Sequence, residues 1–374
     1  MNPPITVLDT GLVYRNPVPH LQSRQAFFPS VVSLPNGELV VAMDIGSAFE
    51  AIDVRSYLCR STDGGQTWSE PQLIFAPDES RHPVSTTCRI SRMPDGNLVG
   101  VAGLFDRTRT ESGLANPATE GFINTAFALV RSGDGGRNWS KPVPVEPPVQ
   151  WDHFESCSPI IAVAQNRWLL PTSFWPDWEG RCLFGAHQAV VFLSEDRGKT
   201  WPRLTSVMDG SAEKITGWEQ KLVTLSDGRL LSVCWRFDYR TRQNLANHYA
   251  LSRDNGDTFG QPLATPLQGE TCTPLALPDN HLLCIYRRTD VRGLWAHLAR
   301  IDGDDWHPLH DYPVWGAQVE ADGGPRASRL AQMSTLRFGC PSVTSLGDRE
   351  VLVVFWCGED FAFNIRWYKL KLAI

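Results

Sequence analysis

The segment Ser61–Trp68, which reads Ser-Thr-Asp-Gly-Gly-Gln-Thr-Trp, decides the fold because near copies of it return three times along the chain. The copies are 132–139, 194–201 and 252–259. In each copy a Ser and an Asp flank a Gly-containing turn, and an aromatic residue closes it. Short polar side chains bond the backbone of their own turn, and Gly accepts the positive φ that such turns require. The pattern predicts four hairpin turns, each covered by an aromatic ring.

A second repeat runs in phase with the first and has the form strand, tight turn, strand. Its first copy, 28–44, places apolar residues on both sides of the turn Asn36-Gly37, which is typical of a β-hairpin. The further copies are 88–106, 157–175, 219–238, 272–290 and 340–360. An apolar third strand follows each hairpin, and an interval of roughly 55–70 residues between copies holds one four-stranded blade. The sequence therefore predicts an all-β, six-bladed β-propeller.

The two ends of the sequence are predicted to share one blade. The last third strand, 364–372, has no fourth strand after it, and the apolar segment 5–8 is a suitable partner. This pairing would close the ring and remove exposed sheet edges. Two stretches, 107–121 and 315–338, are predicted to be long loops that act as lids.

The pattern Ser-x-Asp-x-Gly-x-Thr-Trp resembles the Asp box of the sialidase (neuraminidase) superfamily, whose members are six-bladed β-propellers. The resemblance covers nearly the whole chain and implies a single domain over residues 1–374. It also implies an exo-acting, sialidase-like glycoside hydrolase that cleaves a terminal, anionic sugar. In that family Asp boxes lie on the rim, away from the active site, so the motif indicates the fold more than the reaction.

Charge and composition indicate which partners, compartment and cofactors to expect. The formal charge is -6 without a block of like charge, which favours neither nucleic acid nor an anionic membrane as partner. The start of the sequence lacks the basic and apolar regions of a secretory leader, so a cytoplasmic protein is expected. The nine Cys are scattered without a CxxC pair and are expected to be free thiols, so we expect no metal or cofactor. The oligomeric state is left open.

The repeat also predicts which residues surround the substrate. In a propeller the starts of the innermost strands and the ends of the second strands face the same mouth. The candidates placed there are Arg89, Glu155, Trp175, Trp218, Glu219, Trp235, Arg236 and Arg287. Arg recognises carboxylates as a fork, Trp offers a stacking face, and paired carboxyl groups perform acid/base work. The alternative is that many of these charges pair with one another at the rim.

The resemblance assigns roles to three carboxyl groups. The acid/base carboxylate of sialidases precedes the first Asp box, where this chain has Glu50, with Asp53 three residues later as the alternative. Glu219, at the start of its strand, matches the Glu that activates a nucleophilic Tyr in sialidases. Either acid would need a raised pKa to donate a proton near neutrality, and partial burial would provide one.

Two positions depart from the sialidase pattern. A clamp Arg is expected where this chain has Phe27-Phe28-Pro29, and Arg24 just upstream is the nearest substitute. The nucleophilic Tyr is expected where this chain has Cys340. Without that Tyr, an inverting hydrolysis is the alternative, with two carboxyl groups spaced for a water molecule.

His153, in Trp151-Asp152-His153, supports a second hypothesis. A His beside acids can abstract a proton next to a uronate carboxylate, as in a lyase. The simpler interpretation is a loop histidine bonded to Asp152. A third hypothesis is a sugar-binding propeller without catalysis, because a fold alone confers no activity.

Overall fold

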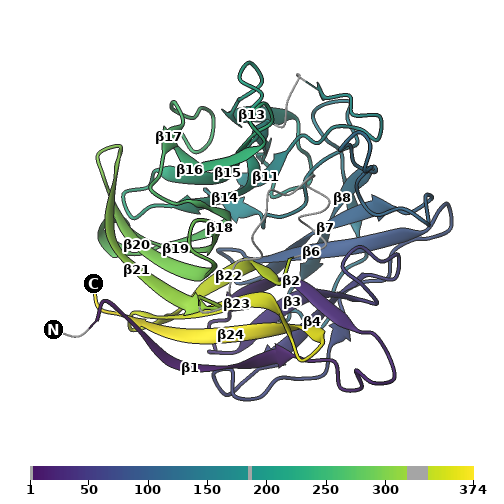
Figure 1. The fold of residues 1–374 in the computed structure, drawn as a ribbon, viewed down its shortest axis with the longest axis horizontal. Helices are drawn as coiled ribbons and strands as arrows, with labels where there is room; N and C mark the ends of the chain where they lie inside the picture. The colour runs from purple at the N-terminus through teal and green to yellow at the C-terminus, as the bar shows by residue number, and fades with distance from the viewer. Residues whose placement is uncertain (1–2, 184–187, 318–335) are drawn as a thin grey trace. The chain divides into compact units, whose positions relative to one another are not determined.

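The computed structural model describes residues 3–183, 188–317 and 336–374. Over these ranges the regular structure consists of β-strands and a short 3₁₀ turn at Pro278–Asn280. The strands form six four-stranded sheets, and Figure 1 labels most of the strands. The predicted fold class, an all-β six-bladed β-propeller, is confirmed. The chain divides into two compact units, each described here by itself, and a single domain over residues 1–374 stays a prediction.

The first unit comprises Met1–Gly113, Phe127–Pro144 and Arg337–Ile374 and contains three of the sheets, one of which extends slightly beyond it. One sheet has the order β2 (Gln25–Ser33), β3 (Leu39–Gly46), β4 (Arg55–Ser61), β5 (Gln72–Leu73). The next has the order β6 (Val84–Arg92), β7 (Leu98–Asp106), β8 (Thr125–Ser132), β9 (Val143–Val145). The third has the order β1 (Ile5–Tyr14), β24 (Ala362–Leu372), β23 (Glu350–Glu359), β22 (Phe338–Gly347).

The second unit comprises Leu114–Ala126 and Val145–Leu336 and contains the other three sheets. The first is β10 (Ile161–Ala162), β11 (Trp168–Ser173), β12 (Ala189–Ser194), β13 (Arg203–Met208). The second is β14 (Trp218–Thr224), β15 (Leu230–Asp238), β16 (Gln243–Ser252), β17 (Leu263–Ala264). The third is β18 (Gly269–Ala276), β19 (His281–Arg288), β20 (Gly293–Asp302), β21 (Asp305–Trp315).

The predicted pairing of the first strand with the last is confirmed. β1 runs antiparallel to β24, from Ile5 opposite Leu372 to Tyr14 opposite Ile365. Figure 1 shows the two strands side by side. The paired strand is longer than the predicted segment 5–8 and continues to the buried residues Val13 and Tyr14.

The repeated Ser-Asp turns are held by their own side chains, as predicted. In the first, the Ser61 hydroxyl donates to Asp63 Oδ1 at 2.7 Å and accepts the Gly65 N–H at 2.8 Å. The Thr67 N–H donates to Asp63 at 3.0 Å, and the Trp68 indole N–H donates to the Gly65 carbonyl at 2.9 Å. Gly65 has φ 99°, a conformation that favours glycine.

The hairpin predicted over 157–175 is shorter than expected. Its inner strand, β10, holds only Ile161 and Ala162. Upstream, Phe154 forms an isolated antiparallel bridge with Phe174. Pro159 has no N–H to give to a ladder, which accounts for the gap between the bridge and the strand.

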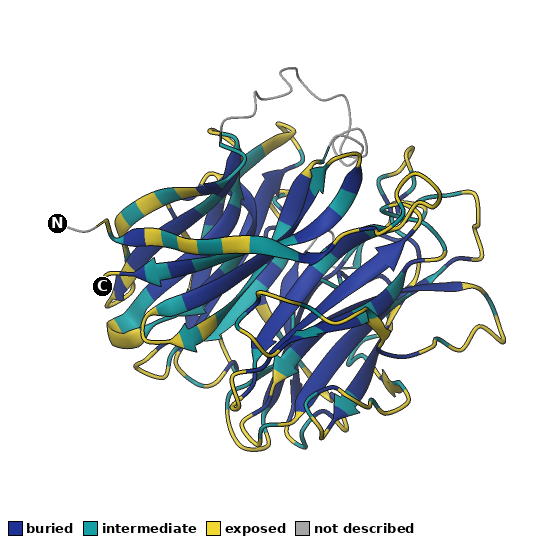
Figure 2. Ribbon diagram, turned by 90° about the horizontal axis from the view of Figure 1, so that it is seen from below, coloured by how far each residue is buried: buried dark blue, intermediate teal, exposed yellow. Residues whose placement is uncertain are grey.

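Burial follows the strands, as Figure 2 shows: strand interiors are buried and loop tips are exposed. Of the two predicted lids, 107–121 is shared between the units, and its part in the second unit is anchored there, where the Asn116 side chain donates to the Trp178 carbonyl at 2.9 Å. Glu120 also pairs with Arg242 at 2.6 Å. Most of the other, 318–335, lies outside the described residues.

No helix in the described part of the chain is long and apolar enough to cross a bilayer. Nor do three or more His, Cys, Asp or Glu side chains gather there in a way that could hold a metal ion.

Candidate active site

Glu219 lies on a β-bulge at the start of β14. Trp218 pairs with Trp235, and the next paired residue is Lys221, opposite Val233. One extra residue is therefore inserted on the β14 side, and Glu219 takes a left-handed φ of 49°. Bulges of this kind re-aim a side chain, and for a residue other than glycine the conformation costs on the order of 1 kcal/mol. The equivalent positions in three other inner strands, Phe28, Thr271 and Cys340, also have positive φ.

Glu155 lies directly against this bulge. Its carboxylate accepts the Glu219 N–H at 2.7 Å. Its own N–H donates to the Ser173 carbonyl at 3.0 Å, and its carbonyl accepts the Thr172 hydroxyl at 2.8 Å. The side chain is 5% exposed. The sequence predicted Glu155 and Glu219 at one place, and the structure brings them together.

Burial raises the pKa of Glu155 to about 7, and the negative charge of Glu219 adds to this effect. The bond from the Glu219 N–H and the positive charge of Lys221 act in the opposite direction and lower the pKa. At neutral pH a substantial fraction of Glu155 is therefore protonated. Neighbouring carboxyl groups in unequal environments are a common arrangement for acid/base chemistry.

Cys157 and Lys221 complete the surroundings of the two acids. The Lys221 ammonium donates to the Cys157 carbonyl at 2.7 Å and lies 3.4 Å from the Ser158 hydroxyl. Burial, together with the charge of Glu155, raises the pKa of the Cys157 thiol. This thiol is protonated at neutral pH and is not an activated nucleophile. All nine cysteines are free.

Two of the three tryptophans expected to stack on sugar are buried. Trp218 is 0% exposed and Trp235 is 6% exposed, with ring centroids 5.1 Å apart. They pack with Phe237 in an aromatic cluster, so neither offers an open face and the expected stacking role does not match the structure. Trp175 is only partly buried, and its ring stacks on that of Phe122 with the ring centroids 4.0 Å apart.

Arg287 and Arg236, both proposed to bind a carboxylate, lie in different environments. Arg287 forms an ion pair with the buried Glu270, which also accepts the Asn244 side-chain N–H at 2.6 Å. Arg236 is 6% exposed, and burial lowers its pKa. Its Nε and Nη1 atoms have no hydrogen-bond partner among the residues that the structure describes. Arg236 is therefore the stronger candidate to receive an anion.

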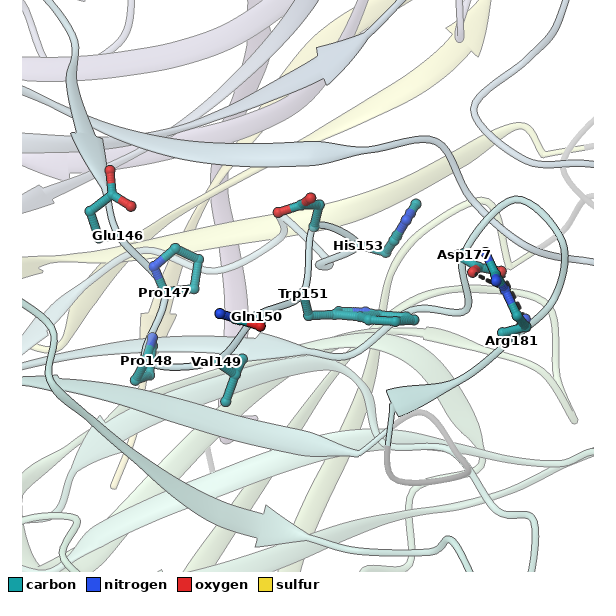
Figure 3. A pocket seen from close by; sticks show the side chains of 10 residues that line it. Glu146, Pro147, Pro148, Val149, Gln150, Trp151, His153, Asp177 and Arg181 are labelled. Carbon is teal, nitrogen blue, oxygen red and sulfur yellow. Dashed lines mark hydrogen bonds and ion pairs between the residues drawn. The ribbon is translucent and has the colours of Figure 1, made fainter.

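A hollow of 770 Å³ lies beside His153 in the second unit. It is lined by residues 146–153 and by Asp177 and Arg181, which form an ion pair at 2.6 Å (Figure 3). His153 is buried, and its Nδ1 lies 3.2 Å from the Ile123 carbonyl. Because a carbonyl can only accept, Nδ1 carries the proton and Nε2 of the neutral ring is the basic nitrogen. The simpler interpretation, a bond to Asp152, is replaced by this contact with a backbone carbonyl.

In the first unit, the two candidate acids Asp53 and Glu50 have different hydrogen-bond partners. Both oxygens of Asp53 accept the Ser47 N–H, at 3.0 and 3.1 Å, so Asp53 fixes its own loop. The Glu50 carbonyl accepts a bond from the buried Arg107 at 2.8 Å. Sequence reasoning missed Arg107, although this residue begins the loop stretch 107–121. The Arg107 charge also acts on the Glu50 carboxylate and favours its ionised form, so these surroundings do not single out Glu50 over Asp53 as a proton donor.

Arg89 and Arg24, which were both predicted to bind substrate, lie in this unit and differ in burial. Arg89 is buried and bonds the Phe28 carbonyl at 2.9 Å and Asp44 at 3.3 Å. Burial raises the pKa of Asp44, and Arg89 opposes that rise. Arg89 is therefore engaged in a structural ion pair, whereas Arg24 is exposed.

Comparisons with known proteins agree with this picture. A family model described as a BNR repeat-like domain matches residues 37–311. A sialidase from Micromonospora viridifaciens is 28% identical over 254 residues. That match covers 62% of this chain and 35% of the relative, so the chain spans about a third of the relative's length.

Solved structures extend the likeness of fold to the whole chain. A protein of unknown function from Dyadobacter fermentans DSM 18053 matches 100% of both chains with a TM-score of 0.74 and 20% identity. The Hadza microbial sialidase Hz136 matches with a TM-score of 0.65 and 18% identity, over 93% of this chain and 66% of that one. At these identities the likeness concerns the fold alone.

Proposed function

This chain belongs to the family of BNR repeat-like domains, and from that membership we propose that it is a glycoside hydrolase with Glu219 as a catalytic carboxylate. The resemblance to the sialidase superfamily is confirmed. The observation that carries the proposal is the position of Glu219: it is partly exposed, it stands on a bulge, and it adjoins a second carboxyl group that is buried.

The proposed substrate is a terminal, anionic sugar. Arg236 supports this choice, because its buried Nε and Nη1 groups have no hydrogen-bond partner among the described residues. A guanidinium suits a sugar carboxylate, since it offers two parallel donors to two oxygens. Two relatives are named sialidases, and a sialic acid glycoside is therefore the first compound to try.

The proposed mechanism uses water as the nucleophile. The position at which sialidases carry a Tyr holds Cys340 in this chain, so a Tyr-linked intermediate is not available there. Glu219 would act as the general base that takes a proton from water, and the sugar would be released with inversion. The role of proton donor to the leaving group is assigned by resemblance to Glu50, with Asp53 as the alternative.

A screen of purified protein tests the proposal. Aryl glycosides of sialic acids, other keto-acid sugars, uronic acids and neutral sugars would be incubated with wild type, Glu219→Gln and, as a matched control, the exposed Glu195→Gln. We expect release of the aryl group from one anionic glycoside, a loss of at least about 100-fold in Glu219→Gln, and no loss in Glu195→Gln. Equal activity in all three proteins would refute the role of Glu219, and binding of a sugar without turnover would identify a sugar-binding protein.

A uronate lyase is the second candidate, because His153 lines the hollow with Nε2 as its basic nitrogen. In that reaction Nε2 would take the proton beside the uronate carboxylate, and the sugar–oxygen bond would break to leave a carbon–carbon double bond. Uronate-containing oligosaccharides would then give a rising ultraviolet absorbance. The His153→Ala variant would abolish it while leaving aryl glycoside release unchanged.

A further inference from the structure

We propose that Glu155 is a positioning residue for Glu219: its carboxylate holds the strained backbone from which the catalytic side chain projects. The inference rests on the proposed function of Glu219 and adds a residue for which the sequence suggested only substrate binding. Glu155 itself is 5% exposed and is buried beneath the bulge, so it acts through Glu219.

Glu155 accepts a backbone hydrogen bond from the residue that the bulge displaces. The bulge removes Glu219 from the register of β14 with β15, and the freed Glu219 N–H is received by Glu155 Oε2 at 2.7 Å. Glu155 is itself tied to β11, because its N–H and carbonyl bond Ser173 and Thr172. The positive φ of Glu219 is therefore fixed from outside its own strand, as expected for a strained residue at a functional site.

The hydrogen bond between Glu155 and the Glu219 N–H is expected to depend on pH, because Glu155 can ionise. The groups that face it are Glu219 and Lys221 on β14, Cys157 on its own segment, and Cys234 on β15. When Glu155 loses its proton, its bond to the Glu219 N–H becomes charge-assisted and therefore stronger. The new negative charge also makes the Glu219 carboxylate a better base, because like charges raise each other's proton affinity. Turnover is therefore expected to rise as pH increases through about 7, the pKa of Glu155.

Kinetics on the substrate found in the screen test the positioning role. Glu155→Gln keeps the size of the side chain and an oxygen acceptor but removes the titrating group. We expect kcat to fall about 10- to 100-fold with KM unchanged within about twofold, and the rise near pH 7 to disappear. Glu195→Gln, which removes an exposed acid of the same unit, should keep the wild-type profile. A Glu155→Gln profile that is lower but keeps the wild-type shape would overturn the proposal.

A second measurement does not depend on activity and separates this proposal from the function of Glu219. In protein labelled with ¹⁵N-glutamate, the amide resonance of residue 219 should move with pH around a midpoint near 7. That movement should be absent in Glu155→Gln and present in Glu195→Gln. An amide that titrates in a protein without glycosidase activity would overturn the proposed function and keep the contact. An amide that does not titrate in an active enzyme would overturn the positioning proposal and keep the function.

Discussion

The replacement Glu155→Gln is expected to stabilise the protein at alkaline pH by removing a buried charge. The ordinary pKa of a Glu is 4.5, and burial raises that of Glu155 to about 7. Between these values the unfolded chain has lost the proton and the native protein still holds it. A raised pKa in the native state means that the stability contributed by this group is fully present below pH 4.5 and is lost as pH rises to about 7.

The size of the effect follows from the same shift. Each pH unit costs about 1.4 kcal/mol, so the wild type loses about 3 kcal/mol across the window relative to a variant that cannot ionise. Near pH 4.5 the amide and the protonated acid are alike, and the two proteins should have nearly equal free energies of unfolding. At pH 8 Glu155→Gln should be more stable by about 3 kcal/mol, which is a rise in Tm of about 4 °C for a chain of 374 residues.

Thermal unfolding by calorimetry at pH 4.5, 6, 7 and 8 would measure this difference. Other titrating groups are common to both proteins and cancel when the two curves are subtracted. Glu146→Gln, which removes an exposed charge, should show no such trend with pH. A difference between Glu155→Gln and wild type that stays flat from pH 4.5 to 8 would refute the reasoning, because it would mean that burial does not keep Glu155 protonated.

Three further predictions concern stability. Replacing Glu219 with Gly should relieve the left-handed backbone at φ 49° and stabilise the protein by about 1 kcal/mol while abolishing turnover; an unchanged denaturation midpoint would contradict the assigned strain. The Arg287→Met variant removes the partner of the buried Glu270 and should cost about 3 kcal/mol, seen as a lower Tm, whereas a higher KM at unchanged Tm would show that Arg287 binds substrate instead. Asp196→Ala removes the acceptor for Thr200 and Ser194 in the third Ser-Asp turn and should cost about 1–2 kcal/mol by denaturant titration without changing activity; lost activity would place this turn nearer the chemistry than expected.

The blades were predictable from sequence because each is built from local hairpin chemistry that repeats. The Ser61–Trp68 pattern specifies its own hydrogen bonds within eight residues, and the apolar ends of the chain left β1 and β24 as natural partners. The meeting of Glu155 with Glu219 was also predictable, because both occupy the same place in consecutive repeats.

The burial and pairing of individual side chains in the candidate site were harder to predict from the sequence. The sequence placed Trp218 at the mouth because it begins an inner strand, but a position along the strand does not show what packs against the side chain. In the structure its ring packs with Trp235 and Phe237 and is buried. Arg287 and Glu270 were both singled out, but their mutual pairing depends on strand register, which composition does not show. Arg107 was missed because its loop has no periodic pattern to mark the residue that turns inward.

The pairing of β1 with β24 has a consequence for synthesis on the ribosome. Bonded residues of these strands, such as Thr10 and Trp367, are 357 positions apart, and the segments of the first unit surround the second unit in the sequence. At the usual speed of translation, β1 waits on the order of tens of seconds before its partner emerges. During that time the second unit can fold and the first cannot be completed. The exposed Thr6 and Thr10 of β1 suit such a delay, because polar side chains make a strand a poorer template for pairing with other nascent chains.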